Sequence, residues 1–459
     1  MKNNKMSGAD GVRAIACLLV IFHHVFQRLA IYDQPVWAQE IQKFFLLGNS
    51  GVSFFFVLSG YLLSYPFWVR YLEGGNFPGS RQYIVKRAAR IMPGYYLAMI
   101  ISTIMGVIFL PNLQYIFLKF FTGMTFTSCF HYLTLFPSQL DSPLWSISFE
   151  VFCYILLPVF MAVLFFFTGK KRSFAKAILF WAGAQILVLC ANGLVHVLFT
   201  PDGLYRSWHY GMTGGSKWWM PNYNPVGFFA HFIMGVLASG FTVRLAAPSE
   251  MKEKLREKGL FDIGAMLFLL AIVLFLWTVR NEKEFSVGFQ GQPFYFPYLT
   301  ALIAGLLVTL AHSKFMGGWL DNPFFRFTAK ISFGLYIWHF IVINLLLFYY
   351  QNFYYESGMR EWVPWAYTSM IMIACSYVIA TLSYYLLEKP FMDRAHKDLK
   401  KEELTGFPRI VYKVKARIRT GQVISRLSSA SWPLSSRTPS YGFSTPLSGR
   451  RLKCSTIRP

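Results

Sequence analysis

The sequence is poor in charged residues and lacks paired cysteines. Asp, Glu, Lys and Arg together make up 14% of its 459 residues, and only 21 side chains are acidic. The six cysteines include no Cys-x-x-Cys pair and mostly lie in apolar runs, so we expect neither a disulfide framework nor a metal site. No His, Cys, Asp or Glu cluster has metal-site spacing, and no glycine-rich nucleotide loop follows a strand pattern. These absences argue against a disulfide-stabilised, metal-dependent or Walker-type protein.

Apolar residues dominate the chain instead. They form 55% of it, the mean hydropathy is +0.40, and runs of about twenty apolar residues recur. The composition predicts an all-α, polytopic membrane bundle of about ten helices. The first run ends in HHVFQRLA, which lacks a small-residue cleavage pattern, so we expect a span there and no cleavable signal peptide. The predicted spans are 12–31, 44–68, 92–110, 145–168, 174–199, 225–243, 260–279, 295–313, 330–350 and 366–387.

The net charge of +23 is concentrated in alternate loops and in the C-terminal tail. Twenty basic residues lie in the N-terminal segment and every second loop, against eight in the opposite loops. Because cytoplasmic loops are enriched in Lys and Arg, we predict that both termini are cytoplasmic. From Lys389 onward there are 16 basic and 4 acidic residues. We therefore predict a membrane domain over 1–395, a basic, disordered cytoplasmic tail over 396–459, and no nucleic-acid partner.

The first span carries ionisable side chains, which are costly in a bilayer and are expected to face the protein interior. Arg13 and His24 are eleven residues apart, or three turns plus about 20°, so they share a helix face with an axial separation of about 16 Å. His23 is rotated by about 100° from that line. The spacing suggests an anion held at the surface by Arg13 and chemistry carried out deeper by His24.

Two more arginines precede the third span, in the segment KRAARIMPGYY. Arg87 and Arg90 share a helix face at spacing i, i+3, and guanidinium groups bind phosphate through paired hydrogen bonds. Positive-inside charge alone would explain either residue by itself. Because the two are in phase and level with Arg13, the sequence favours an anion site.

Glu150 lies in the segment LWSISFEVF, which opens the fourth span from the outside. Helix rise places it about 8 Å below the outer end of that span and His24 about 18 Å above the cytoplasmic end of the first, so both lie in the outer half of a core about 30 Å thick. One interpretation is a carboxylate hydrogen-bonded to His24. The other is a pair with another cation, or with Ser146 or Ser148.

Other polar residues in the spans have both structural and functional interpretations. Tyr336 and His339 lie at i, i+3 in the ninth span, where His339 either belongs to the site or bonds a neighbouring carbonyl. Ser59 would form a hydrogen bond between helices, and Gly60 would allow close packing. Glu388 ends the tenth span at the cytoplasmic face, where a basic residue would pair with it.

Six segments occur in an order that resembles the acyltransferase 3 family of integral-membrane O-acyltransferases. They are the Arg13-x10-His24 span, FFFVLSGYLL, KRAARIMPGYY, LWSISFEVFCYILLP, ISFGLYIWHF and SYYLLEKPF, and together they cover about residues 8–395. Members of this family transfer an acyl group from cytoplasmic acyl-CoA to hydroxyl groups of cell-surface glycans and related acceptors. The resemblance implies a multi-pass protein of the bacterial inner membrane that uses acetyl-CoA, with no metal, to O-acetylate a polysaccharide.

The resemblance also implies roles for individual residues. His24 would be the catalytic histidine with Arg13 as its companion, Arg87 and Arg90 the pair that binds acyl-CoA, and Glu150 the acidic residue of the Trp-Ser-Glu segment. Val151 stands where the family usually has a second acidic residue, so that carboxylate pair is absent from this segment. The remaining candidates for substrate contact or support are Ser59, Trp145, Ser148, Tyr336, His339 and Glu388.

Two mechanisms and one other function stay open at this point. His24 is predicted to act as general base on an acceptor hydroxyl, and an acyl-His intermediate is also compatible with the sequence. The chain would alternatively be a lipid or glycan transporter, although transporters more often show Gly- and Pro-interrupted helices in both halves. The other multispanning O-acyltransferase group built around a membrane histidine fits these motifs less well. Because a short basic tail follows the spans, we expect acceptor handling within the membrane domain or by a partner.

Overall fold

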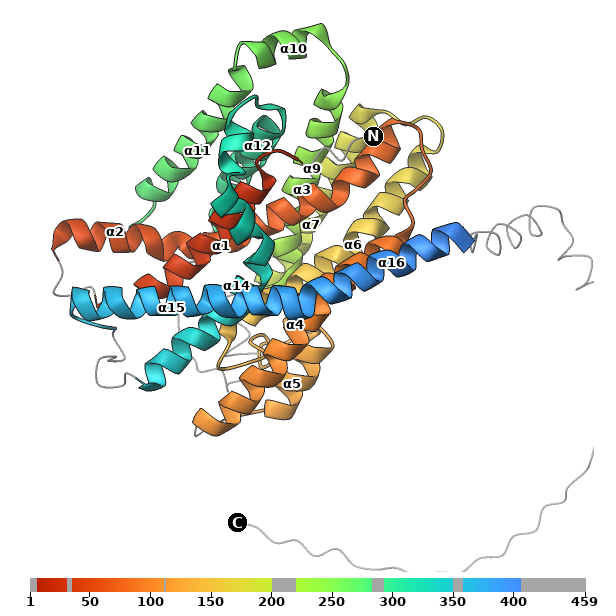
Figure 1. Cartoon of the computed structure of the whole chain (residues 1–459). Helices are drawn as coiled ribbons and strands as arrows, with labels where there is room; N and C mark the ends of the chain where they lie inside the picture. The colour runs from red at the N-terminus through yellow and green to blue at the C-terminus, as the bar shows by residue number, and fades with distance from the viewer. Residues whose placement is uncertain are drawn as a thin grey trace, which may run out of the picture. The chain divides into compact units, whose positions relative to one another are not determined.

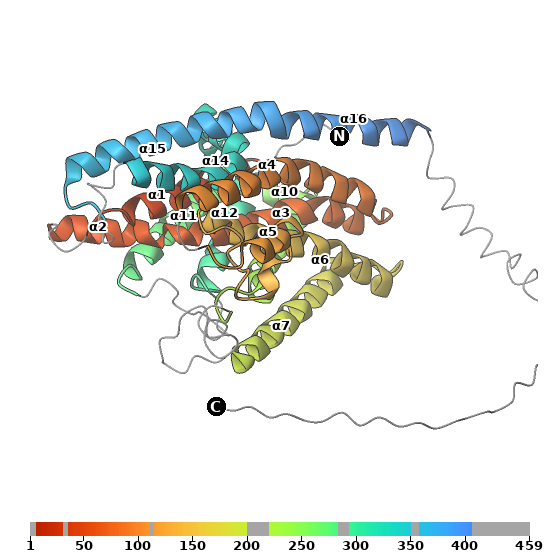
Figure 2. The ribbon, with the colours of Figure 1, turned by 90° about the horizontal axis from the view of Figure 1, so that it is seen from below.

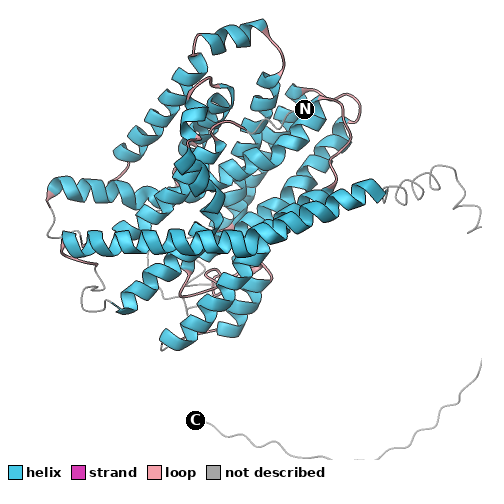
Figure 3. Ribbon diagram, in the orientation of Figure 1, coloured by secondary structure: helices cyan, strands magenta, loops and turns pink. Residues whose placement is uncertain are grey.

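The computed structural model describes residues 6–30, 35–110, 113–199, 220–282, 293–349 and 358–405. Within these ranges the chain is mainly helical and forms no strand (Figure 3), and one isolated bridge joins Leu29 and Met359. Nine helical segments in the described ranges are long and apolar enough to cross a membrane, and Tyr298–His312 is a shorter apolar helix. The predicted class, a multi-pass α-helical membrane protein, is confirmed. The cytoplasmic location of the termini stays a prediction.

Ten apolar helices form the body of the described chain (Figure 1). They are α1 (Ala9–Phe26), α3 (Gly51–Leu72), α4 (Ser80–Phe109), α6 (Trp145–Thr168), α7 (Phe174–Leu198), α9 (Pro225–Ala246), α11 (Leu260–Thr278), α12 (Tyr298–His312), α14 (Pro323–Tyr349) and α15 (Trp362–Ser383). Shorter helices are α2 (Val36–Leu46), α5 (Ile116–Met124), α10 (Glu250–Glu257), α13 (Met316–Leu320) and α16 (Lys389–Thr405). We call the face where α1 begins the proximal face and the face where it ends the distal face.

The predicted spans all fall on helices, with differences at the ends. α4 begins at Ser80 rather than 92, so Arg87 and Arg90 lie inside the helix. The predicted span 44–68 includes a 3₁₀ turn, η1 (Leu47–Ser50), between α2 and α3. Gly48 and Gly51 lie directly against backbone carbonyls of α1, where a Cβ would not fit, and this close contact explains the turn. α16 continues past the predicted boundary at 396, and the rest of the predicted tail, 406–459, lies outside the described residues.

Helices α3 and α9 pack unusually close together. A Cβ on Gly60 would collide with the carbonyl oxygen of Phe232, and one on Gly235 would collide with that of Val57. Small residues allow this approach, because without a Cβ the two backbones come into direct contact. The packing role expected of Gly60 agrees with this geometry. The contact fixes α3, which supplies one wall of the site.

The other wall is α14, which lies between α1 and α15 (Figure 2). The Cys17 thiol of α1 donates to the carbonyl of Ser332 on α14 at 3.6 Å, and the Trp365 indole of α15 donates to the carbonyl of Val25 at 3.0 Å. At the proximal face, the buried Asp321 carboxylate accepts hydrogen bonds from the backbone N–H groups of Gly8 and Gly11, both at 3.0 Å. A carboxylate at a helix N-terminus is favourable, and it holds the first turn of α1 in place. Arg13 follows directly after that turn.

Candidate functional site

Three arginines from two helices line one cavity of about 220 Å³, which we call the arginine cavity. Arg13 comes from α1, and Arg87 and Arg90 come from α4. All three side chains are half-buried. Within the described residues, none of these guanidinium groups has a hydrogen-bond or ion-pair partner. Partly buried cations are costly without an anion, so this cluster has the character of a site for an anionic ligand.

Glu150 also lines the arginine cavity. Its carboxylate accepts a hydrogen bond from Ser59 Oγ at 3.0 Å and another from the Tyr154 hydroxyl. The structure does not bring Glu150 to His24, and it does not show the alternative bonds to Ser146 or Ser148. Ser59 does form the hydrogen bond between helices that its position suggested.

The distance between Glu150 and His24 has a simple cause. The residues before α6 are buried and cover its first turn, so α6 begins inside the protein rather than at the distal surface. Its first residue, Trp145, already lines the cavity of His24. Five residues of helix rise then place Glu150 about 7.5 Å further toward the proximal face. The expected common depth of Glu150 and His24 assumes instead that this helix begins at the membrane surface.

His24 lines a second cavity, of about 240 Å³, which we call the histidine cavity. The His24 ring lies between other rings, with centroids 4.8 Å from His23, 5.2 Å from His339 and 4.8 Å from Phe340. Its Nδ1 is 3.0 Å from Oε1 of Gln27. Because an amide oxygen only accepts, Nδ1 carries the proton and Nε2 is the basic nitrogen. A neutral ring in this tautomer accepts a proton at Nε2.

The neighbouring histidines are anchored to backbone carbonyls. His339 is fully buried, and its Nδ1 donates to the carbonyls of Leu335 at 2.9 Å and Tyr336 at 2.8 Å. The Nδ1 of His23 lies 2.6 Å from the carbonyl oxygen of Leu46. The two carbonyl contacts are those expected of a structural histidine. His339 also packs against His24, as expected of a residue that belongs to the site. The structure thus agrees in part with each of the two interpretations of His339.

The arginine and histidine cavities share a wall. Val52 of α3 and Tyr336 of α14 line both of them. The Tyr336 hydroxyl donates to the carbonyl of Pro143 at 3.0 Å and lies 2.6 Å from Ser146 Oγ. These bonds fasten the Tyr336 side chain to the start of α6. The two cavities are thus adjacent, with Val52 and Tyr336 in the wall that they share.

The remaining predicted residues have distinct positions. The Trp145 ring lines the histidine cavity and packs edge-to-face on Tyr223, with centroids 4.7 Å apart. Ser148 accepts a hydrogen bond from Ser128 Oγ at 3.0 Å and lines neither cavity, so it fastens the buried segment before α6. Glu388 is buried at the proximal end and accepts a hydrogen bond from Ser383 Oγ at 3.2 Å.

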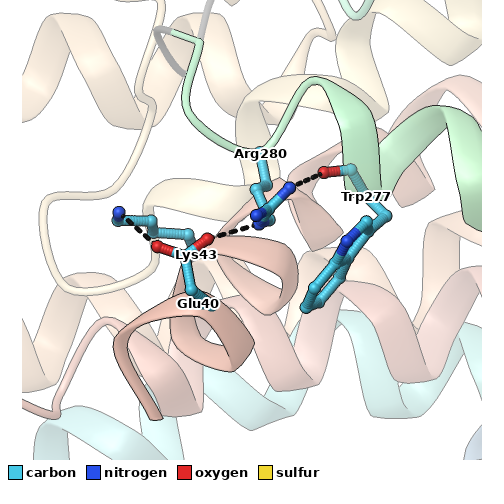
Figure 4. Close-up of polar contacts among 4 residues, drawn as sticks. All are labelled: Glu40, Lys43, Trp277 and Arg280. Atoms are coloured by element: carbon cyan, nitrogen blue, oxygen red, sulfur yellow. Dashed lines mark hydrogen bonds and ion pairs between the residues drawn. The ribbon is translucent and has the colours of Figure 1, made fainter. Parts of the chain in front are cut away.

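The distal face carries a charged cluster that the sequence analysis missed (Figure 4). Arg280 Nε donates to Glu40 Oε2 at 2.5 Å, Lys43 donates to Glu40 Oε1 at 2.7 Å, and the Arg280 guanidinium stacks on Trp277. Lys43, Arg280 and Gln27 line a cavity of about 390 Å³ there. Gln27 also lines the histidine cavity, so the two adjoin. The sequence indicates a contact between Gln27 and His24 only through their spacing of three residues, which places them on one helix face.

The fold and the site define a multi-pass membrane protein with an arginine-lined cavity next to a histidine cavity. Within the described part of the chain, no group of three or more metal-ligating side chains comes together. The sequence profile described as "Acyltransferase domain" matches residues 6–384, and the chain belongs to this acyltransferase family. The resemblance to the acyltransferase 3 family is thereby confirmed.

Two curated relatives show how far the similarity extends. The chain is 26% identical over 433 residues to "Putative peptidoglycan O-acetyltransferase YrhL" of Bacillus subtilis, an alignment that covers 92% of this chain and 59% of the relative. It is 22% identical over 391 residues to "Peptidoglycan O-acetyltransferase OatA" of Listeria monocytogenes, covering 83% of this chain and 55% of the relative. The chain thus spans less than two thirds of either relative. No solved structure matches it.

Proposed function

We propose that this protein is a membrane O-acetyltransferase that moves an acetyl group from acetyl-CoA to a hydroxyl group of a cell-surface glycan. The observation that carries the proposal is the adjacency of the two cavities. Unpaired arginines of the described chain line one, His24 lines the other, and Tyr336 and Val52 line both. The names of the relatives YrhL and OatA support peptidoglycan as the class of acceptor. The family membership supports acyl transfer as the reaction.

In this proposal the donor enters from the proximal face, which is the cytoplasmic side. Arg13, Arg87 and Arg90 bind its phosphates, because guanidinium groups form paired hydrogen bonds with phosphate oxygens. Arg13 and His24 are eleven positions apart on one continuous helix, which corresponds to about 16 Å of rise. The pantetheine arm is long enough to cover most of this distance and to bring the thioester past Tyr336 to His24.

The acceptor hydroxyl enters from the distal face and meets the thioester at His24. Nε2 takes the hydroxyl proton while the oxygen attacks the thioester carbonyl. The C–S bond then breaks, and the CoA thiolate leaves and takes the proton back from Nε2, which regenerates the base. General-base catalysis of this kind contributes typically about 10² to 10⁴ in rate. We assign Glu150 to positioning the donor arm, since it lies in the arginine cavity between Ser59 and Tyr154.

The first experiment tests His24. The purified full chain in liposomes is given acetyl-labelled acetyl-CoA and a peptidoglycan glycan, and alkali-labile label on the glycan is measured. His24→Ala should lose at least about 100-fold in kcat, because the base is gone. The matched control is His131→Ala, an exposed histidine before α6, which should keep activity. Substantial ester formation by a folded His24→Ala variant would reject the proposed role, and glycan movement without ester formation by the wild type would favour a transporter.

The second experiment tests the arginine cavity. Arg87→Ala removes charge-assisted hydrogen bonds worth about 1.5–3 kcal/mol, so the KM for acetyl-CoA should rise about 10- to 150-fold. Arg81→Ala, an exposed arginine two turns earlier on the same helix, is the control and should leave KM unchanged. An unaltered KM in Arg87→Ala would remove the phosphate assignment.

A further inference from the structure

A third cavity, of about 430 Å³, adjoins the arginine cavity at the proximal face. The two share Arg13 and Arg90. The other residues that line the third cavity have no role in the reaction proposed above. The charged residues that line it are Asp10, Arg13, Arg90, Arg326, Lys330 and Glu388.

The cations of this cavity are positioned from two sides. Arg326 and Lys330 lie four residues apart on α14 and therefore share a helix face, opposite Arg13 and Arg90 from α1 and α4. The Lys330 ammonium group donates to the Tyr385 hydroxyl at 2.9 Å, which orients it. The Arg326 guanidinium has no hydrogen-bond or ion-pair partner within the described residues. Four cations against two carboxylates give a net positive site that is open at the proximal face.

An aromatic ring lies beside these charges. Tyr384 lines the cavity and is the first residue of a π-helical turn, η6 (Tyr384–Glu388), between α15 and α16. Such turns are rare and frequently occur at functional sites. This one places both Tyr384 and Glu388 in the cavity lining. A flat ring next to paired cations is the arrangement that binds a nucleotide, through stacking on the base and hydrogen bonds to phosphate.

We infer that the third cavity binds the adenosine end of the donor, with Arg326 and Lys330 recognising the ribose 3′-phosphate and Tyr384 stacking on the adenine. This inference rests on the proposed use of acyl-CoA. It separates two phosphate sites: the arginine cavity holds the pyrophosphate that leads into the pantetheine arm, and the third cavity holds the phosphate that distinguishes coenzyme A from dephospho-coenzyme A. Arg13 and Arg90 lie between the two and contact both.

The test compares acetyl-CoA with acetyl-dephospho-CoA in the double variant Arg326→Ala/Lys330→Ala. In the wild type, loss of the 3′-phosphate should raise KM about tenfold or more, as expected for charge-assisted hydrogen bonds. In the double variant, KM for acetyl-CoA should rise to the dephospho value, KM for acetyl-dephospho-CoA should stay the same, and kcat should be unchanged. Arg244→Ala/Lys258→Ala removes two exposed basic residues outside the cavity and is the matched control.

A binding measurement tests the site without turnover. Adenosine 3′,5′-bisphosphate should raise the unfolding temperature of the detergent-solubilised full chain more than 5′-AMP does, and the double variant should lose this difference. An equal response to the two nucleotides, or a preference that the double variant retains, overturns the inference. Phosphatidylglycerol is tested in the same way. If it stabilises the wild type but not the double variant, and adenosine 3′,5′-bisphosphate stabilises neither, the cavity binds a lipid headgroup and the inference is overturned. Absence of acetyl transfer with every donor would count against the proposed function alone, because the unfolding temperatures with the two nucleotides test the cavity independently of the reaction.

Discussion

Gln27 is the residue whose replacement tests most directly how His24 is prepared for catalysis. It lies one residue beyond α1, and its Oε1 accepts the hydrogen bond from His24 Nδ1 at 3.0 Å. Gln27→Leu removes the acceptor while keeping a side chain of similar length. The His24 ring then has no partner that selects the Nδ1–H tautomer. The fraction of molecules with Nε2 ready to accept a proton should fall.

The size of the effect follows from the single hydrogen bond that is lost. A neutral hydrogen bond contributes about 0.5–1.5 kcal/mol net, and Gln27 is exposed, so water competes for it. That range corresponds to a fall of about 2- to 12-fold in kcat. The KM for acetyl-CoA should not change, because our proposal places the donor phosphates in the arginine cavity, which Gln27 does not line. A larger loss would mean that Gln27 also contacts the acceptor.

The assay is the steady-state rate of ester formation at varied acetyl-CoA. Gln27→Glu keeps an acceptor oxygen at the same position, so it should restore most of the kcat that Gln27→Leu loses. Gln139→Leu, an exposed glutamine before α6, controls for the loss of an amide in general. If Gln27→Leu and the wild type have equal kcat, or if Glu and Leu at position 27 behave alike, the tautomer argument fails.

Two further predictions concern stability. Gly235→Ala places a Cβ against the carbonyl of Val57, so it should lower the free energy of unfolding by about 1–3 kcal/mol. The control is Gly183→Ala, which should be neutral or stabilising because nothing lies within 4 Å of the added Cβ. Equal unfolding temperatures of the two variants in detergent would contradict the close contact. Asp141 lies outside the spans, fully buried and with both carboxyl oxygens unpartnered within the described residues, and burial raises the pKa of its carboxyl well above the usual value. In the folded protein the Asp141 carboxyl keeps a proton that the unfolded chain releases near pH 4. Above that pH the free energy of unfolding should fall by about 1.4 kcal/mol per pH unit, until the pKa of Asp141 in the folded protein is reached. Asp141→Asn should remove this slope in unfolding temperature between pH 5 and 8, while Glu257→Gln on exposed α10 should keep it.

The sequence contained enough information to predict the helices and the arginine cluster. Long apolar runs leave few alternatives to spanning helices, because the bilayer requires every backbone group to be bonded within the segment. Arg87 and Arg90 are three residues apart, which places them on one face of a helix. The helix that carries them, α4, begins at Ser80, before the predicted span, so both arginines lie on that face. Arg13 joins them because Asp321, distant in sequence, holds the start of α1. That last contact has no local signature.

The pairing of Glu150 with His24 shows where such reasoning fails. Depth along a helix was counted from the membrane surface, but α6 starts behind buried residues that no hydropathy pattern identifies. Helix rotation was equally out of reach: which face Glu150 presents depends on α3, whose Ser59 bonds it, and α3 is fixed by the contact with α9. Rotation and offset between helices come from packing across the whole bundle, and a single sequence does not contain them explicitly.

The wall formed by Val52 and Tyr336 gives the proposed reaction a physical rationale. Moving a nucleotide with several negative charges through the bilayer core is prohibitively costly, whereas an acetyl thioester on a neutral pantetheine arm is not. A protein that keeps the phosphates at unpaired arginines near one face therefore needs to let only the arm pass between two side chains. The Tyr336 hydroxyl is bonded to Pro143 and Ser146 at the start of α6, so these bonds hold this side of the wall in place. In the proposed reaction the acyl group crosses while the charge stays behind, and this division accounts for the positions of Arg13 and His24 on one helix but in separate cavities.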